Sequence, residues 1–175
     1  RDEKGFVVDG LYAAGECACV SIHGANSLGW NSLLDLLVFG RRSGLAMKEN
    51  ISQVKHYSVS TDPLKRVKER ITKFLDAQGG TRAGQVRQEM QSLMMDYGSV
   101  FRNEAGLKKG IEEIRSLKEN YGNVEILNKG KIFNYELMEA IELGHQLEVA
   151  EVILLSALHR RESRGAHFRE DFPKR

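Results

Sequence analysis

The hydrophobic pattern of the chain changes near residue 50. Over residues 5–22 apolar and polar side chains alternate, and a period of two residues is typical of β-strands. The alternation is interrupted at Gly15 and Glu16. The first segment therefore predicts two short strands on either side of a corner at these two residues.

A helix is predicted next, starting at Asn31 or Ser32 and running towards Met47. Either of the two polar residues could cap its N-terminus. The apolar side chains of this segment surround the helix axis, and a helix that is apolar on all sides is normally buried. We therefore expect this helix to be enclosed by other parts of the structure.

After residue 50 the pattern favours helices. The sequence Thr61-Asp62-Pro63 combines a capping side chain with a proline at the first helical position, and Gly79-Gly80 ends this helix. A second helix is predicted from Thr81. Two more follow, one through residues 107–121 and a long one capped by Asn134 over residues 135–159, and residues 122–131 are predicted to form a loop. The side chains expected to point inwards are Val67, Ile71, Phe74, Leu75, Val86, Met90, Leu93, Met94, Leu107, Ile111, Ile114 and Leu117.

The predicted architecture is mostly α overall: an α/β segment over residues 1–50 and a mainly α-helical bundle over residues 51–175. The last helix carries apolar residues on most sides, so we place it at the centre of the bundle, with short connections that favour antiparallel neighbours. The chain does not begin with Met, and we expect it to be a piece of a longer protein.

Charge and cysteine content narrow the function. The 26 basic and 24 acidic residues give a net charge of +2, which gives no reason to expect nucleic-acid binding. Only Cys17 and Cys19 are present, and two cysteines are too few ligands for a typical metal site, so we predict no metal. We expect both thiols to be buried on one face of a strand, in a protein of a reducing compartment. The longest apolar runs fall short of the roughly 20 residues that span a bilayer.

Residues 10–35 carry the candidate chemistry. An apolar segment runs into Gly15-Glu16, a glycine-rich loop containing His23 follows, and a helix begins after it. This order places a carboxylate at a strand end and unpaired backbone N–H groups at a helix N-terminus. A carboxylate can accept a hydrogen bond from a ribose or ribityl hydroxyl, and helix N–H groups favour anionic or electron-rich ligand atoms. The segment therefore indicates contact with a cofactor.

A family resemblance sharpens this indication. The chain resembles the flavoprotein subunits of succinate dehydrogenase and fumarate reductase in four stretches: GLYAAGECA, HGANSLGWNSLLDLLVFGRRSG, RQEMQSLMMDYGSVFRNEAGLKKGIEEI and ELMEAIELGHQLEVAEVILLSALHRRESRGAHFREDFP. The resemblance implies that residues 1–50 end an FAD-binding domain and that residues 51–175 form the helical C-terminal domain. No G-x-G-x-x-G motif occurs, so the pyrophosphate-binding part is expected upstream.

The resemblance also assigns candidate site residues. It implies FAD contacts by Glu16, Asn31, Ser32 and Leu33. Without the resemblance, Glu16 would be read as an ordinary surface glutamate and Asn31 or Ser32 as a helix cap. The flavin-linking histidine and the family's catalytic arginine are expected upstream, so we predict no catalytic residue within this chain and an inactive isolated fragment.

Three further residues are expected to line the substrate pocket: His23, Ser27 and Trp30. Ser27 stands where the family normally has an arginine that binds a substrate carboxylate, and serine lacks the arginine's charged, bidentate fork. Trp30 replaces a small residue. Both differences leave the natural substrate open. Near the C-terminus, Arg164 and His167 match the family as well, and for them we expect a structural ion-pair role.

The resemblance implies an intact enzyme of electron transport and the tricarboxylic acid cycle that interconverts succinate and fumarate. Its expected partners are an iron–sulfur subunit that receives the electrons and membrane-anchor subunits. It is expected in the cytoplasm, peripheral on the inner face of the membrane. Two alternatives remain: a flavoenzyme similar to L-aspartate oxidase, and a helical module, residues 51–175, that only docks partner subunits.

Overall fold

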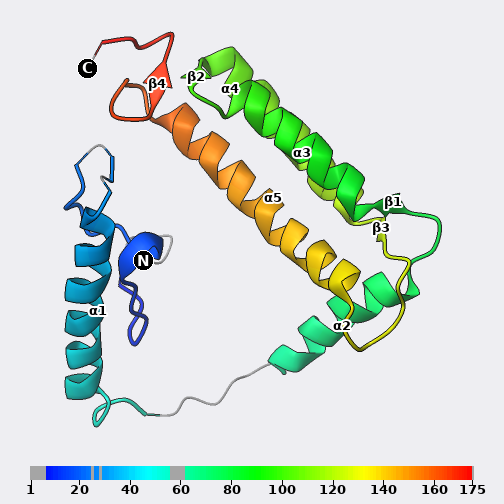
Figure 1. The fold of residues 1–175 in the computed structure, drawn as a ribbon, viewed down its shortest axis with the longest axis horizontal. Helices are drawn as coiled ribbons and strands as arrows, with labels where there is room; N and C mark the ends of the chain where they lie inside the picture. The colour runs from blue at the N-terminus through cyan, green and yellow to red at the C-terminus, as the bar shows by residue number, and fades with distance from the viewer. Residues whose placement is uncertain (1–6, 25, 28, 56–61, 175) are drawn as a thin grey trace. The chain divides into compact units, whose positions relative to one another are not determined.

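The structure is a computed structural model that describes residues 7–24, 26–27, 29–55 and 62–174 (Figure 1). The chain divides into two compact units, residues 1–60 and residues 61–175. Each is described by itself. None of the described helices has the length and hydrophobicity needed to cross a bilayer.

The N-terminal unit contains a 3-10 turn, η1 (Gly15–Cys17), and a helix, α1 (Asn31–Asn50). The two strands predicted over residues 5–22 are wrong for the described part, residues 7–22, which contains no strand. The backbone is extended at Ala14 and at Ala18, as the alternation suggests. Extended segments become strands only when another strand pairs with them, and here Gly15, at φ 80°, turns the chain instead.

The start of α1 also differs from the prediction. Trp30 is the N-cap residue, at φ 68°, and no side chain caps the helix. Neither Asn31 nor Ser32 acts as the cap, because both lie inside α1 and the Ser32 hydroxyl is hydrogen-bonded to that of Ser27 at 2.7 Å. The backbone N–H of Asn31 donates to the carbonyl of Gly29 instead.

The N-terminal unit buries little apolar surface. Asp35 is the buried residue of α1, and Leu34 and Leu37 are 62% and 65% exposed. Within the described residues, α1 is therefore not enclosed, and its burial remains a prediction. Cys17 and Cys19 are both exposed, so the prediction of buried thiols is wrong, because η1 interrupts the extended backbone that would have placed them on one face.

The C-terminal unit is a helical bundle. Its elements are α2 (Pro63–Asp76), β1 (Thr81–Arg82), α3 (Ala83–Tyr97), β2 (Phe101–Arg102), α4 (Glu104–Tyr121), β3 (Val124–Glu125), α5 (Tyr135–His159) and β4 (Phe168–Arg169). Helices α3, α4 and α5 lie side by side, and two short parallel pairs, β1 with β3 and β2 with β4, lie at opposite ends of the three helices (Figure 1). The mainly α fold class is confirmed.

Helix α5 packs against α2, α3 and α4, as expected of a central helix. Its buried residues form a single stripe at spacings of three and four: Ala140, Leu143, Leu147, Ala150, Leu154 and Ala157. On its other side Met138, Val149 and Val152 are exposed. The apolar residues that seemed to lie on most sides are thus buried on one face only.

Local signals set most helix ends in this unit. The Asp62 carboxylate accepts from the N–H of Leu64 at 3.0 Å, and the Asn134 side chain accepts from the N–H of Leu137 at 2.9 Å; both capping predictions are confirmed. Thr61 lies outside the described residues. Thr81 does not open a helix, because its N–H donates to the carbonyl of Asn123 at 3.2 Å in the β1–β3 pair.

Two other predictions in this unit are also changed. Residues 122–131 are not a simple loop, since Val124 and Glu125 form β3 opposite β1. Val67 was expected to point inwards, but it is 54% exposed on α2, whereas Phe74 near the end of that helix is buried. Only the second half of α2 therefore contributes strongly to the core.

Candidate functional site

The N-terminal candidate site begins at the turn that carries Glu16. Gly15 adopts φ 80°, and a side chain there would have its Cβ 3.4 Å from the Cβ of Leu36. The turn therefore packs closely on α1. Glu16 itself is exposed, so a carboxylate available to a ligand hydroxyl lies on a turn held against this helix.

A polar pair, half-buried His23 and buried Asp35, joins the loop to α1. The Nε2 atom of His23 lies 3.0 Å from Oδ2 of Asp35, with side-chain exposures of 22% and 4%. This distance is that of a hydrogen bond between the ring nitrogen and the carboxylate oxygen. The other two polar atoms of the pair, His23 Nδ1 and Asp35 Oδ1, are buried and have no hydrogen-bond partner among the described residues.

The remaining predicted site residues surround the start of α1. Ser27 is joined to Ser32 through their hydroxyl groups. The backbone N–H of Leu33 donates to the carbonyl of Trp30 at 3.1 Å, so this donor is used within the helix. The Trp30 side chain is 83% exposed.

The structure therefore brings two sets of the predicted residues together, Ser27 with Ser32 and Leu33 with Trp30. It joins His23 to a residue that the sequence analysis did not select, Asp35. The one available signal was an acidic residue in the otherwise apolar run Leu33–Phe39. The position of an acidic residue in an apolar run does not show which side chain its carboxylate will contact.

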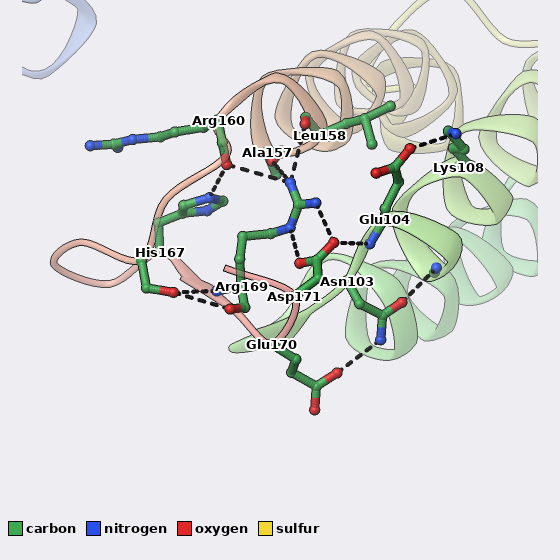
Figure 2. Close-up of polar contacts among 12 residues, drawn as sticks. Asn103, Glu104, Lys108, Ala157, Leu158, Arg160, His167, Arg169, Glu170 and Asp171 are labelled. Atoms are coloured by element: carbon green, nitrogen blue, oxygen red, sulfur yellow. Dashed lines mark hydrogen bonds and ion pairs between the residues drawn. The ribbon is translucent and has the colours of Figure 1, made fainter. Parts of the chain in front are cut away.

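A second polar cluster closes the C-terminal end of the bundle (Figure 2). The fully buried guanidinium of Arg169 donates to the carbonyl oxygens of Ala157 and Leu158 at the end of α5, at 3.0 and 3.1 Å. It also forms a forked pair with Asp171 at 2.7 and 2.6 Å. Asp171 in turn accepts from the N–H of Glu104 at the start of α4.

This arrangement places a cation at a helix C-terminus and an anion at a helix N-terminus, which suits both helix dipoles. The hydrogen bond from Arg169, together with that from the Glu104 N–H, lowers the pKa of Asp171 to about 2. The predicted ion-pair role near the C-terminus is therefore filled by Arg169 and Asp171.

Arg164 and His167 make different contacts from the ion pair that was predicted for them. They form an isolated backbone bridge, with N–H to O distances of 2.8 and 3.1 Å. The ring of buried His167 lies between Arg102, 2.9 Å from Nδ1, and the carbonyl of Arg160, 2.9 Å from Nε2. With all of these groups satisfied by the chain itself, the cluster is structural. No group of three or more possible metal-ligating side chains occurs in the part of the chain that the structure describes.

Comparison with known proteins identifies the family. Residues 87–175 match the model of the fumarate reductase flavoprotein C-terminal domain, and residues 1–33 match an FAD-binding domain. The chain belongs to the succinate dehydrogenase and fumarate reductase flavoprotein family. The C-terminal match contains the Arg169 cluster, and the N-terminal match contains Glu16 and His23 but ends before Asp35.

Individual relatives agree with this assignment. The chain is 45% identical over 170 residues to the succinate dehydrogenase flavoprotein subunit of Rickettsia conorii, covering 97% of this chain and 28% of that protein. It is 42% identical over 175 residues to the fumarate reductase flavoprotein subunit of Mycobacterium tuberculosis, covering 95% and 30%. The chain thus spans less than a third of the length of these flavoprotein relatives.

The fold agrees too. The solved structure of Mycobacterium smegmatis Sdh1 in complex with UQ1 superposes with a TM-score of 0.87 at 35% identity, covering 94% of this chain and 28% of that one. At this level of identity, both the fold and the family membership are supported by the same alignment.

Proposed function

We propose that this chain is part of an FAD-dependent flavoprotein subunit that interconverts succinate and fumarate and passes the electrons to an iron–sulfur subunit. The observation that carries the proposal is the 45% identity to a succinate dehydrogenase flavoprotein subunit over nearly the whole chain. The domain boundary that we propose lies at residue 50, between the FAD-binding part and the helical part.

The residues around η1 and the start of α1 fit FAD. Bound FAD supplies the two-electron acceptor and donor for the reaction. On the protein side, the exposed Glu16 carboxylate lies on a turn packed against α1 and can accept a hydrogen bond from a cofactor hydroxyl. Asn31, Ser32 and Leu33 form the first turn of α1, where the helix dipole stabilises negative charge on a ligand.

The proposed substrate pocket is lined by His23, Ser27 and Trp30. The Ser27 hydroxyl is neutral and already hydrogen-bonded to Ser32, so it provides no counter-charge for a carboxylate. We therefore expect this flavoprotein to bind dicarboxylates less tightly than a protein with arginine at this position. The catalytic groups themselves are proposed to lie in the part of the protein outside this chain.

The partners proposed for the intact protein are the iron–sulfur subunit and membrane-anchor subunits. They would hold the flavoprotein on the cytoplasmic side, peripheral to the inner face of the membrane. This proposal rests on the family to which the chain belongs.

The direct test is the visible absorption spectrum of the full-length flavoprotein before and after anaerobic addition of succinate. We expect the flavin band to be present and to bleach with succinate, and to recover with fumarate. A flavin band that does not respond to succinate would show that the cofactor is bound but that the substrate is different. Absence of any flavin band would contradict the FAD assignment.

A second test concerns the pocket residues. The double variant Ser27→Arg with Trp30→Gly restores a charged fork and removes the indole, and glycine suits the backbone at φ 68°. A charge-assisted, bidentate contact should lower the KM for succinate at least tenfold. The single variant Trp30→Gly is the matched control, and an unchanged KM in the double variant would remove Ser27 from the proposed pocket.

A further inference from the structure

Asp35 is the unusual residue of α1. The helix carries leucines that are 42% to 65% exposed at positions 33, 34, 36 and 37, yet its buried residue is this aspartate, at 4% exposure. Burying a carboxylate is costly unless a partner compensates. The partner is His23, twelve residues earlier in the chain. The buried Asp35 carboxylate and the His23 ring therefore form the polar contact to be explained.

We propose that Asp35 is the positioning residue for His23: its carboxylate holds the imidazole through the Nε2 hydrogen and thereby fixes the loop against α1. This inference rests on the proposed function for its substrate, since His23 is proposed to line the substrate pocket. The hydrogen bond that one ring nitrogen makes decides which nitrogen carries the hydrogen. With Nε2 donating to Asp35, the tautomer that carries its hydrogen on Nε2 has Nδ1 as an acceptor.

Both members of this pair keep an unsatisfied buried atom, whereas in the bundle only Arg87 Nε does so among the described residues. In the Arg169 cluster, the buried guanidinium is satisfied by carbonyl and carboxylate oxygens of the same unit. In the His23–Asp35 pair each member keeps one buried polar atom, Nδ1 and Oδ1, without a partner among the described residues. Buried polar atoms are nearly always hydrogen-bonded in complete structures, so these two atoms are available to bond a further group.

The His23–Asp35 pair lies where it can affect the proposed substrate pocket. His23 precedes Ser27 in the loop, and Asp35 follows Ser32 by one helical turn. The His23–Asp35 hydrogen bond and the Ser27–Ser32 hydroxyl contact therefore join the same loop to the same helix. A group that holds both His23 and the loop should affect substrate binding more than the rate of the chemical step.

The test uses the full-length flavoprotein with the variants Asp35→Asn and Asp35→Glu. Asparagine keeps the size but removes the charge, and glutamate restores it one methylene further out. The matched control is Glu49→Gln, which removes a charge from an exposed residue of the same helix. For Asp35→Asn we expect the KM for succinate to rise about tenfold, because a charge-assisted hydrogen bond becomes a neutral one, while kcat changes less than about twofold.

Hydrogen–deuterium exchange provides a second readout that does not need turnover. The peptide carrying His23 should exchange faster in Asp35→Asn than in the wild type or in Glu49→Gln, and Asp35→Glu should restore most of the protection and most of the KM. Equal exchange and equal KM in all four proteins would overturn the proposal. If the wild type does not respond to succinate, the proposed function fails, but the exchange comparison still decides whether Asp35 holds the loop.

Should Asp35→Asn fail to accumulate as a folded flavoprotein, the reciprocal variants carry the test. His23→Gln retains an N–H donor for Asp35 and should keep the slow exchange of the loop, whereas His23→Leu should lose it. Equal exchange in these two variants would overturn the proposal.

Discussion

The two units of this flavoprotein chain bury different kinds of side chain. Every buried apolar side chain of the described residues lies between Phe74 and Ala157, in the C-terminal unit. The described residues of the N-terminal unit bury only Gly15 and Asp35. The C-terminal unit thus supplies its own hydrophobic core. In the described N-terminal residues, the segment before α1 is joined to this helix by the contact of Gly15 with Leu36 and by side-chain hydrogen bonds. A hydrophobic core mainly stabilises the folded state. A polar pair mainly fixes how the two segments that it joins are positioned.

The largest effect should come from the core of the bundle. Leu147 of α5 is 1% exposed, and Leu37 of α1 is 65% exposed. Leu147→Ala removes buried methyl groups and leaves a cavity, so we expect a loss of about 4 kcal/mol in the free energy of unfolding. Leu37→Ala should cost less than about 0.5 kcal/mol. Urea denaturation of the 175-residue chain measures both losses. Equal losses would contradict the conclusion that the hydrophobic core lies in the C-terminal unit.

A smaller but still large effect is expected at Arg169, where the C-terminal unit also relies on a polar contact. Arg169→Met removes the fork to Asp171 and the donors to the end of α5, with an expected loss of about 3 kcal/mol. Arg169→Lys keeps the charge but not the planar fork, and we expect an intermediate loss. If both variants unfold like the wild type in the same urea titration, the cluster does not stabilise the bundle.

The smallest effect is a pH dependence from Asp171, whose pKa falls from 3.8 to about 2 in the folded protein. A lowered pKa means that the folded state favours the ionised form. This contribution is complete above the unfolded pKa and is lost as the pH falls from about 4 towards 2. The difference in unfolding free energy between the wild type and Asp171→Asn should therefore shrink on acidification over this window.

The exposed Asp96 of α3 provides the control for that measurement. Asp96→Asn keeps the change of charge but not the contact with Arg169. A difference between the wild type and Asp171→Asn that stays constant from pH 5 to pH 2 would contradict the lowered pKa.

The sequence predicted the helices of the bundle well because their signals are local. The predicted limits of the last helix, residues 135–159, agree with α5, and the caps at Asp62 and Asn134 involve residues only two or three positions away. Predictions failed where distant segments meet. Thr81 and residues 124–125 form a parallel pair across more than forty residues, and no periodicity within either segment reveals it.

The candidate site divides in the same way. His23, Ser27 and Ser32 could be selected from a short motif, and the assignment of Glu16, Asn31, Ser32 and Leu33 to FAD remains a prediction from the family. Asp35 was missed because its importance lies in its contact with His23. The contact depends on how the loop folds back on α1, and the residue types alone do not determine that path.

The amino-acid sequence by itself determined the helical character of the C-terminal unit, its capping residues and the family to which the chain belongs. These depend on residue spacing, on side chains that hydrogen-bond to nearby backbone groups, and on motifs that follow one another along the chain. The tertiary structure decided which face of α5 is buried, which short segments pair as strands, and which carboxylate meets His23. Those outcomes depend on contacts between residues far apart in the chain, where the free energy of burial and pairing outweighs any local preference.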